Sequence, residues 1–110
     1  MLSAPDRWVI LEISPKGAEK FYKVMGGWRG GYASSDSWRI NSGITGVLEK
    51  SNTFDIGGHS GSRYVCNKDR YGLTGLMADI LHKYLDVTKE IRLLDKDEAW
   101  DTLKTITTTA

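Results

Sequence analysis

The chain has 110 residues, of which 40% are hydrophobic and 26% are charged, and its formal net charge is +1. This length and composition are typical of one small globular domain with a modest hydrophobic core. The near-neutral charge argues against a general nucleic-acid binder, which needs a basic excess to neutralise phosphates, and against a nucleic-acid mimic, which needs an acidic excess.

The first predicted element is a strand at residues 8–13, WVILEI, a short apolar run rich in β-branched residues. Residues 14–17, SPKG, predict a turn. The next segment, residues 18–25, fits two interpretations. Its apolar residues have helical spacing, but the short connection also favours a hairpin back onto the first strand. We favour the strand.

The glycine- and serine-rich residues 26–37 predict a loop, or a pair of bulged strand ends around a loop. The segment after this loop, residues 38–49, has the clearest alternation of apolar and polar residues in the chain, with Val47 as the exception. Strict alternation is typical of a strand with one buried face. We therefore predict one long strand here, with a bulge or bend at Gly43 and Gly46.

Two shorter strands follow, one around Phe54 and Ile56 and one at residues 63–67, with a glycine-rich turn between them. Thr74 is a residue type that caps helices. The apolar residues after it repeat at the spacing of one helix face, and they are Leu76, Met77, Ile80, Leu81 and Tyr84. This pattern predicts an amphipathic helix.

The C-terminal part predicts an edge strand at residues 90–94, a short helix at residues 95–104 and a frayed tail at residues 105–110. The expected fold is therefore α+β: a single domain over residues 1–110, with a mainly antiparallel sheet of five or six strands. One long helix and one short C-terminal helix pack on this sheet.

The turn at residues 57–63, GGHSGSR, is the first candidate binding element. Successive glycines allow backbone N–H groups to converge on an anion, and serine and arginine side chains can complete the site. The turn lacks the lysine of a Walker loop and the second glycine of a nucleophile elbow. A plain hairpin turn is the competing interpretation. The candidate anion- or ligand-binding residues are Gly58, His59, Ser60, Ser62 and Arg63.

A second candidate element is the segment GGWRGGY at residues 26–32. Its Trp28, Arg29 and Tyr32 belong to the residue types enriched at interface hot spots, because they bury a large area and form hydrogen bonds at their tips. Its glycines permit close approach of a partner backbone. The competing interpretation is that Trp28 and Tyr32 complete the hydrophobic core.

No motif in the sequence predicts catalysis or metal binding. His59 and Cys66 lack a second cysteine or a paired histidine, so they do not form a zinc-ligand pattern. His59 and Ser60 are adjacent, and adjacent side chains usually point apart. We therefore expect a non-enzymatic protein without a metal or cofactor. The lone cysteine and the absence of a secretory signal or a membrane-length apolar run lead us to expect a cytoplasmic protein without a membrane segment.

Part of the chain, within residues 20–75, resembles a pattern found in small uncharacterised tailed-phage proteins. The resemblance is carried by WRINSGI at residues 38–44, then by Phe54, by Ser60-Gly61-Ser62, and by Tyr64 and Cys66. It implies a compact accessory protein made in the cytoplasm of an infected bacterium. Such proteins often bind and block a host factor, including components of antiviral defence. The resemblance implies no catalytic residue.

Three functional hypotheses remain open at the level of sequence. The leading one is a binding protein, a phage-encoded inhibitor of a bacterial host or antiviral-defence protein, with Trp28, Arg29 and Tyr32 as the contact. The alternative is a small-ligand binder, such as a sponge for a signalling nucleotide, that uses the turn at residues 57–63. The third is a nucleic-acid binder that uses the mildly basic central segment, against which the net charge argues. The oligomeric state stays open.

Overall fold

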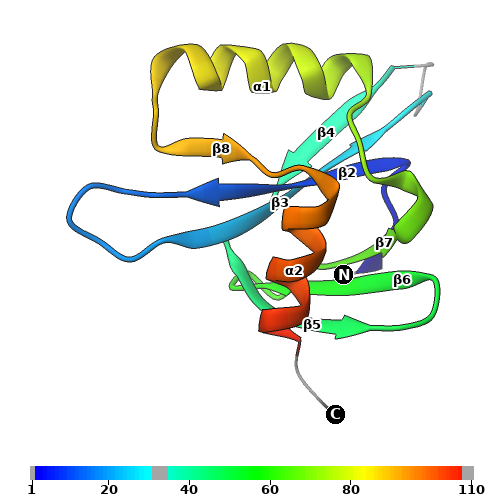
Figure 1. The fold of residues 1–110 in the computed structure, drawn as a ribbon. Helices are drawn as coiled ribbons and strands as arrows, with labels where there is room; N and C mark the ends of the chain where they lie inside the picture. Colours follow the sequence, from blue (N-terminus) through cyan, green and yellow to red (C-terminus); the bar gives the residue numbers. More distant parts are fainter. Residues whose placement is uncertain (1, 31–34, 108–110) are drawn as a thin grey trace.

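The computed structural model describes residues 2–30 and 35–107. The described chain forms strands and helices in an α+β arrangement (Figure 1). In chain order the elements are β1 (Leu2–Ser3), β2 (Arg7–Ile13), β3 (Phe21–Trp28), β4 (Ser37–Ile40), β5 (Ile44–Glu49), β6 (Thr53–Gly58), β7 (Arg63–Asn67), the 3-10 helix η2 (Lys68–Arg70), α1 (Gly75–Val87), β8 (Ile91–Leu93) and α2 (Lys96–Ile106).

The strands form two sheets rather than one. Sheet A has the order β1-β7-β6-β5, and sheet B has the order β4-β3-β2-β8. The pairing of β1 with β7 is parallel, and the other strand pairs within the described residues are antiparallel. The predicted α+β class is therefore confirmed and the predicted number of strands fits roughly, but the prediction of a single sheet is wrong.

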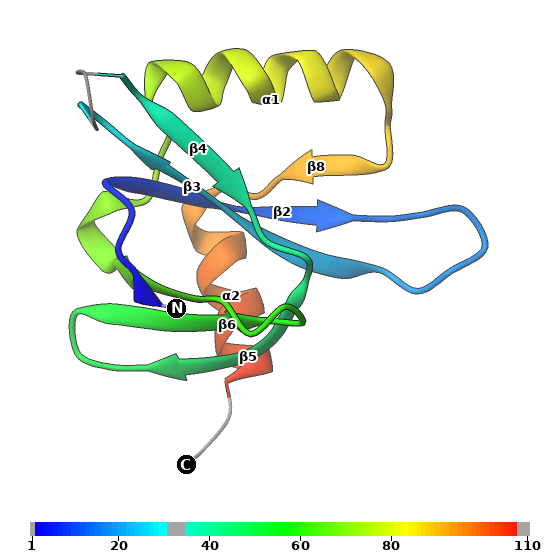
Figure 2. The same cartoon turned by 180° about the vertical axis from the view of Figure 1, so that it is seen from behind.

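The segment predicted as one long strand is divided between the two sheets. The chain leaves sheet B after Ile40 and enters sheet A at Ile44, a passage that is clear in Figure 2. Gly43 makes this step in a left-handed conformation, with φ at 141°. A register shift between Ile44 and Gly46 then reverses the alternation, so Val47 faces the core and the exception in the sequence pattern is explained.

Sheet B is buried on both faces. In β2, Trp8 and Ile10 point to one side and Val9 and Leu11 to the other, and all four are buried. The helix α1 covers the second side, where Met77 and Leu81 pack on the sheet, and it lies along sheet B in both views (Figures 1 and 2). This two-sided burial explains why β2 is a continuous apolar run.

The larger core lies between the sheets and against α2. The inner face of sheet A contributes Val47, Phe54, Ile56, Tyr64 and Cys66 to this core. Residues of α2 and the aromatic rings of Trp8, Tyr71 and Trp100 complete it. The other face of sheet A carries Thr53, Asp55, Gly57, Arg63 and Val65, and the two pockets described below lie on that face.

The remaining predictions of secondary structure can be compared with these elements. Residues 21–28 form a strand in a hairpin with β2, so the strand interpretation is confirmed. Thr74 caps α1 through a hydrogen bond from the Met77 N–H to the Thr74 Oγ1, at 3.2 Å. The edge strand at β8 is also confirmed. The second helix, α2, extends to Ile106, two residues into the segment predicted as a tail.

Neither helix is long and apolar enough to cross a membrane, within residues 2–30 and 35–107.

Candidate functional site

Three arginines from separate parts of the chain line one pocket of about 470 Å³. They are Arg7 at the start of β2, Arg29 just after β3, and Arg70 at the end of η2. We call this place the arginine corner. Its other lining residues are Ala4, Pro5, Asp6, Thr53, Val65 and Asn67.

The N-terminal segment forms one wall of the arginine corner, and hydrogen bonds fix it to the end of β3. The Asp6 N–H donates to the Gly27 oxygen at 2.8 Å. In return, the Arg29 N–H donates to the Asp6 Oδ2 at 2.6 Å, and the Trp28 Nε1–H donates to the Ala4 oxygen at 3.1 Å. The backbone that carries Arg29 is therefore held in place although its side chain is exposed.

Trp28 has a structural role at this corner. It is half-buried, it packs against the core between the sheets, and its ring centroid lies 6.4 Å from that of Tyr64. The sequence left a partner contact and a core position open for Trp28. The contacts show that part of the indole is a packing group. Tyr32, the third predicted contact residue, lies outside the described residues.

The glycines before Trp28 have a different role from the predicted one. A Cβ atom on Gly26 would lie 3.0 Å from the Pro5 Cβ, and one on Gly27 would lie 2.4 Å from the Met77 Sδ. Both glycines are buried inside strand β3. Their small size lets the N-terminal segment and α1 pack closely on the strand. The prediction that they expose backbone to a partner is wrong.

The charges of the arginine corner are not balanced by ion pairs. None of the ion pairs within residues 2–30 and 35–107 includes Arg7, Arg29 or Arg70. Arg92, by contrast, pairs with Glu12 at 3.2 Å and with Glu98 at 2.7 Å. A cleft lined mainly by charges of one sign attracts ions of the opposite sign. The corner therefore has the electrostatic character of an anion site.

The glycine-rich turn connects β6 and β7 as a hairpin, as the competing interpretation predicted. Its backbone N–H groups already have acceptors inside the protein. Gly58 donates to the Ser62 oxygen at 3.1 Å, His59 to the Gly43 oxygen at 3.2 Å, and Gly61 to the Gly58 oxygen at 3.0 Å. Ser60 donates to the Ser42 Oγ at 3.2 Å. The predicted backbone cradle for an anion is therefore not formed.

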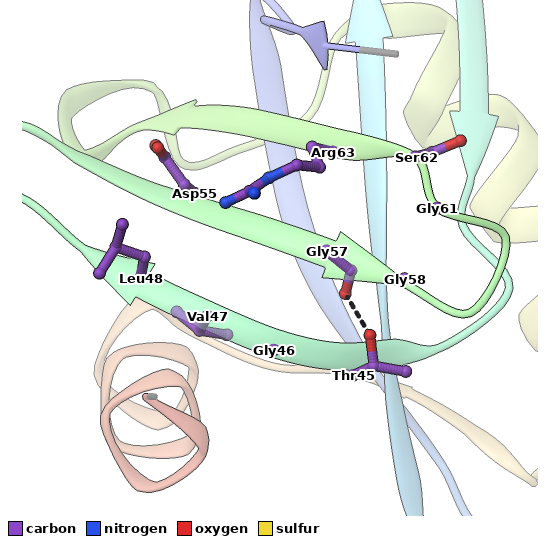
Figure 3. Close-up of a pocket in the computed structure, with 10 residues that line it drawn as sticks. All are labelled: Thr45, Gly46, Val47, Leu48, Asp55, Gly57, Gly58, Gly61, Ser62 and Arg63. Atoms are coloured by element: carbon purple, nitrogen blue, oxygen red, sulfur yellow. Dashed lines mark hydrogen bonds between the residues drawn. The ribbon is translucent and has the colours of Figure 1, made fainter. Parts of the chain in front are cut away.

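A pocket of about 370 Å³ lies beside this turn, on the outer face of sheet A. Figure 3 shows its floor, where the glycines leave the backbone of β5 and β6 bare, with Arg63 extended across β6 toward Asp55. Of the predicted ligand-binding residues, Gly58, Ser62 and Arg63 line this pocket, whereas His59 and Ser60 do not.

The charges at this second pocket suit an anion less well than those of the arginine corner. Asp55 is buried in the pocket wall, where its Oδ2 lies 3.0 Å from the Lys50 Nζ and its Oδ1 accepts from the Thr53 Oγ1 at 3.1 Å. The pocket thus offers one guanidinium, that of Arg63, beside a carboxylate that already pairs with Lys50. A single guanidinium attracts an anion less strongly than the three guanidinium groups of the arginine corner.

The groups with shifted pKa values are held in structural contacts. Burial raises the pKa of Tyr71 to about 12, and the phenol donates to the Leu94 oxygen at 2.7 Å while it accepts from the Ile10 N–H at 3.0 Å. Burial likewise raises the pKa of the Cys66 thiol, which lies in the core. Hydrogen bonds from Arg92 lower the pKa of Glu12. None of these groups lines either pocket.

No cluster of three or more metal-ligating side chains occurs in the part of the chain that the structure describes. His59 is exposed and Cys66 is buried. The ring of His59 packs near Gly43, where an added Cβ would lie 3.0 Å from the histidine Cδ2.

Sequence reasoning identified Arg29 but missed Arg7 and Arg70, which complete the arginine corner. These three residues are far apart in the chain, and no local motif connects them. Their meeting depends on the parallel pairing of β1 with β7, which brings the N-terminal segment beside the residues that lead into η2.

No family model, curated protein or solved structure matches this chain.

Proposed function

We propose that the protein is a non-enzymatic binding protein whose main contact surface is the arginine corner. The observation that carries this proposal is the meeting of three arginines from three separate segments, none of them in an ion pair among the residues that the structure describes. The half-buried Trp28 precedes one of them, Arg29. Arginine and tryptophan supply much of the binding energy at protein interfaces. Backbone held by hydrogen bonds loses little conformational freedom on binding.

The partner class that we propose is a protein with an acidic contact surface. Unpaired guanidinium groups form bidentate hydrogen bonds with carboxylates and raise the rate of encounter with an acidic surface. With the resemblance to tailed-phage proteins, our proposal extends to a phage-encoded inhibitor that binds a bacterial host or antiviral-defence protein.

Affinity purification from bacterial lysate tests this proposal. The parent protein is compared with Arg29→Ala and with Lys83→Ala, which removes a positive charge from the exposed face of α1. We expect Arg29→Ala to lose the partner and Lys83→Ala to retain it, with both variants keeping the parental melting temperature. Equal capture by all three proteins, or capture of nothing by the parent, would contradict the proposal.

Small-ligand binding is the second candidate function. The observation in its favour is that the arginines surround a hollow of about 470 Å³, a volume within the usual range of small-molecule sites. A flat protein interface does not need such a hollow.

A further inference from the structure

We infer that the arginine corner binds the phosphate group of a small phosphorylated molecule, through the guanidinium groups of Arg7, Arg29 and Arg70. This inference rests on the second candidate function and is independent of protein binding. It places the anion site away from the glycine-rich turn to which the sequence pointed.

The charge of the pocket matches that of a phosphomonoester. Arg7, Arg29 and Arg70 contribute three positive charges and Asp6 one negative charge, which leaves a net charge of two positive units at the lining. A phosphomonoester carries about −1.5 to −2 charges at neutral pH. A single carboxylate would leave part of this positive charge uncompensated.

The chemistry of the lining side chains also fits phosphate. A guanidinium group is planar and presents paired N–H donors that match two oxygens of one phosphate. Asn67 adds an amide to the lining, and its Oδ1 already accepts from the Asp69 N–H at 3.2 Å, which leaves the side-chain N–H₂ group for the ligand. Phosphate oxygens only accept hydrogen bonds, so a donor-rich lining suits them.

The three arginines are attached to fixed parts of the fold. Arg7 lies in β2 and pairs with Gly27 in the sheet. The Asp6 carboxylate holds the N–H of Arg29. Arg70 ends η2, in which the Asn67 side chain accepts from the Asp69 N–H. The ligand therefore meets three anchored attachment points.

The remaining space indicates an organic ligand rather than free phosphate alone. A phosphate group fills only a small part of about 470 Å³. Ala4, Pro5 and Val65 line the same pocket and offer apolar surface to a ring or a sugar. Extended nucleic acid fits less well, because the pocket contains Asp6 and the net charge of the chain is only +1.

Isothermal titration with four probes tests this inference: adenosine 5′-monophosphate, adenosine, inorganic phosphate and a single-stranded oligothymidylate. We expect the monophosphate to bind, inorganic phosphate to bind more weakly, and adenosine not to bind. In Arg70→Ala the affinity for the monophosphate should fall about tenfold or more, since a charge-assisted hydrogen bond is lost.

Arg63→Ala is the matched control, because it removes the same side chain from the other pocket on the same face of sheet A. It should change the affinity about twofold at most, through screened long-range attraction alone. Both arginines are exposed, so the two variants should keep the parental melting temperature without ligand.

Three results would overturn the inference. One is the absence of binding by either phosphate-bearing small probe. Another is an equal loss of affinity in Arg63→Ala and Arg70→Ala, which would indicate general charge attraction. The third is tight binding of the oligonucleotide alone, which would assign the corner to nucleic acid. In each of these cases, a protein partner that Arg29→Ala fails to capture would still support the proposed protein-binding function. The protein-binding proposal and the phosphate-binding inference can therefore fail separately.

Discussion

Asn41 pairs with the backbone of Val24 as a neighbouring strand would, through its own backbone N–H and its side-chain oxygen. The Asn41 N–H donates to the Val24 oxygen at 3.0 Å, and the Asn41 Oδ1 accepts from the Val24 N–H at 2.9 Å. Asn41 is buried at the point where the chain leaves sheet B for sheet A. A single residue thus satisfies the Val24 backbone just where the adjacent strand β4 has ended.

We predict that Asn41→Ala destabilises the protein by about 1–3 kcal/mol, because the buried N–H of Val24 loses its acceptor. Urea denaturation followed by circular dichroism measures this change. Asn52→Ala is the control, since Asn52 is exposed in the turn between β5 and β6, and it should cost about 0.5 kcal/mol or less. Equal costs in the two variants would contradict a special role for Asn41.

Gly27→Ala should destabilise the protein by about 1–3 kcal/mol through overpacking. The new methyl group would meet the Met77 side chain and would lie 3.1 Å from the Oγ1 of Thr74, which caps α1. Gly75→Ala is the matched control at the first residue of α1, where an added Cβ meets nothing within 4 Å. This control should raise the melting temperature slightly. Unchanged stability in Gly27→Ala would show that Met77 moves aside freely.

Cys66 should react with a thiol reagent only when the protein unfolds. The thiol is fully buried in strand β7. Burial is the main cause that raises its pKa, and the negative charge of Asp55 raises it further, so little thiolate is present. Labelling with Ellman's reagent in increasing urea should follow the unfolding curve seen by circular dichroism. Rapid labelling of the native protein would contradict the position of Cys66 in the core.

Arg92→Met should make the stability of the protein less sensitive to a fall in pH through the acid range. Hydrogen bonds from Arg92 lower the pKa of Glu12 below its ordinary value of 4.5 in the folded state. The ionised form of Glu12 is thus favoured by folding. The stabilisation that ionised Glu12 gives to the folded state is fully present above about pH 4.5 and is lost as the pH falls through the lowered pKa of Glu12.

The difference in unfolding free energy between the parent and Arg92→Met should therefore be largest near neutral pH and should shrink below the ordinary glutamate pKa. Urea midpoints over a pH series measure it. Lys89→Met removes the same charge from an exposed loop that has no ion pair in the described residues, and its effect should not change over this range.

The sequence predicted the individual elements better than their arrangement. The alternation in β4 and β5, the cap at Thr74 and the apolar run in β2 are local signals, and each corresponds to an element of the structure. The division of residues 38–49 between two sheets was not predicted, because a bulge and a change of sheet both interrupt alternation at a glycine. Only the pairing partners distinguish them.

The candidate site was predicted in part for a similar reason. Arg29 was identified because it lies in a conspicuous local segment. Arg7 joins it through the β2–β3 hairpin, and Arg70 joins only through contacts between segments far apart in the chain, such as the bridge between Trp8 and Tyr71. The glycines of the turn at residues 57–63 suggested an anion cradle. The N–H groups of Gly58 and Gly61 instead bond within the turn, and those of His59 and Ser60 bond to Gly43 and Ser42 in the segment before β5. The latter contacts depend on the tertiary fold.

The burial of sheet B on both faces has a consequence for hydrogen exchange. Amide protons at the centre of β2 and β3 lie between two cores, so they should exchange with deuterium only when the whole molecule opens. Amides along the short edge strands β4 and β8 should exchange sooner, through local fraying. Exchange at the central hairpin should therefore report global unfolding, whereas exchange at the edge strands should report local opening.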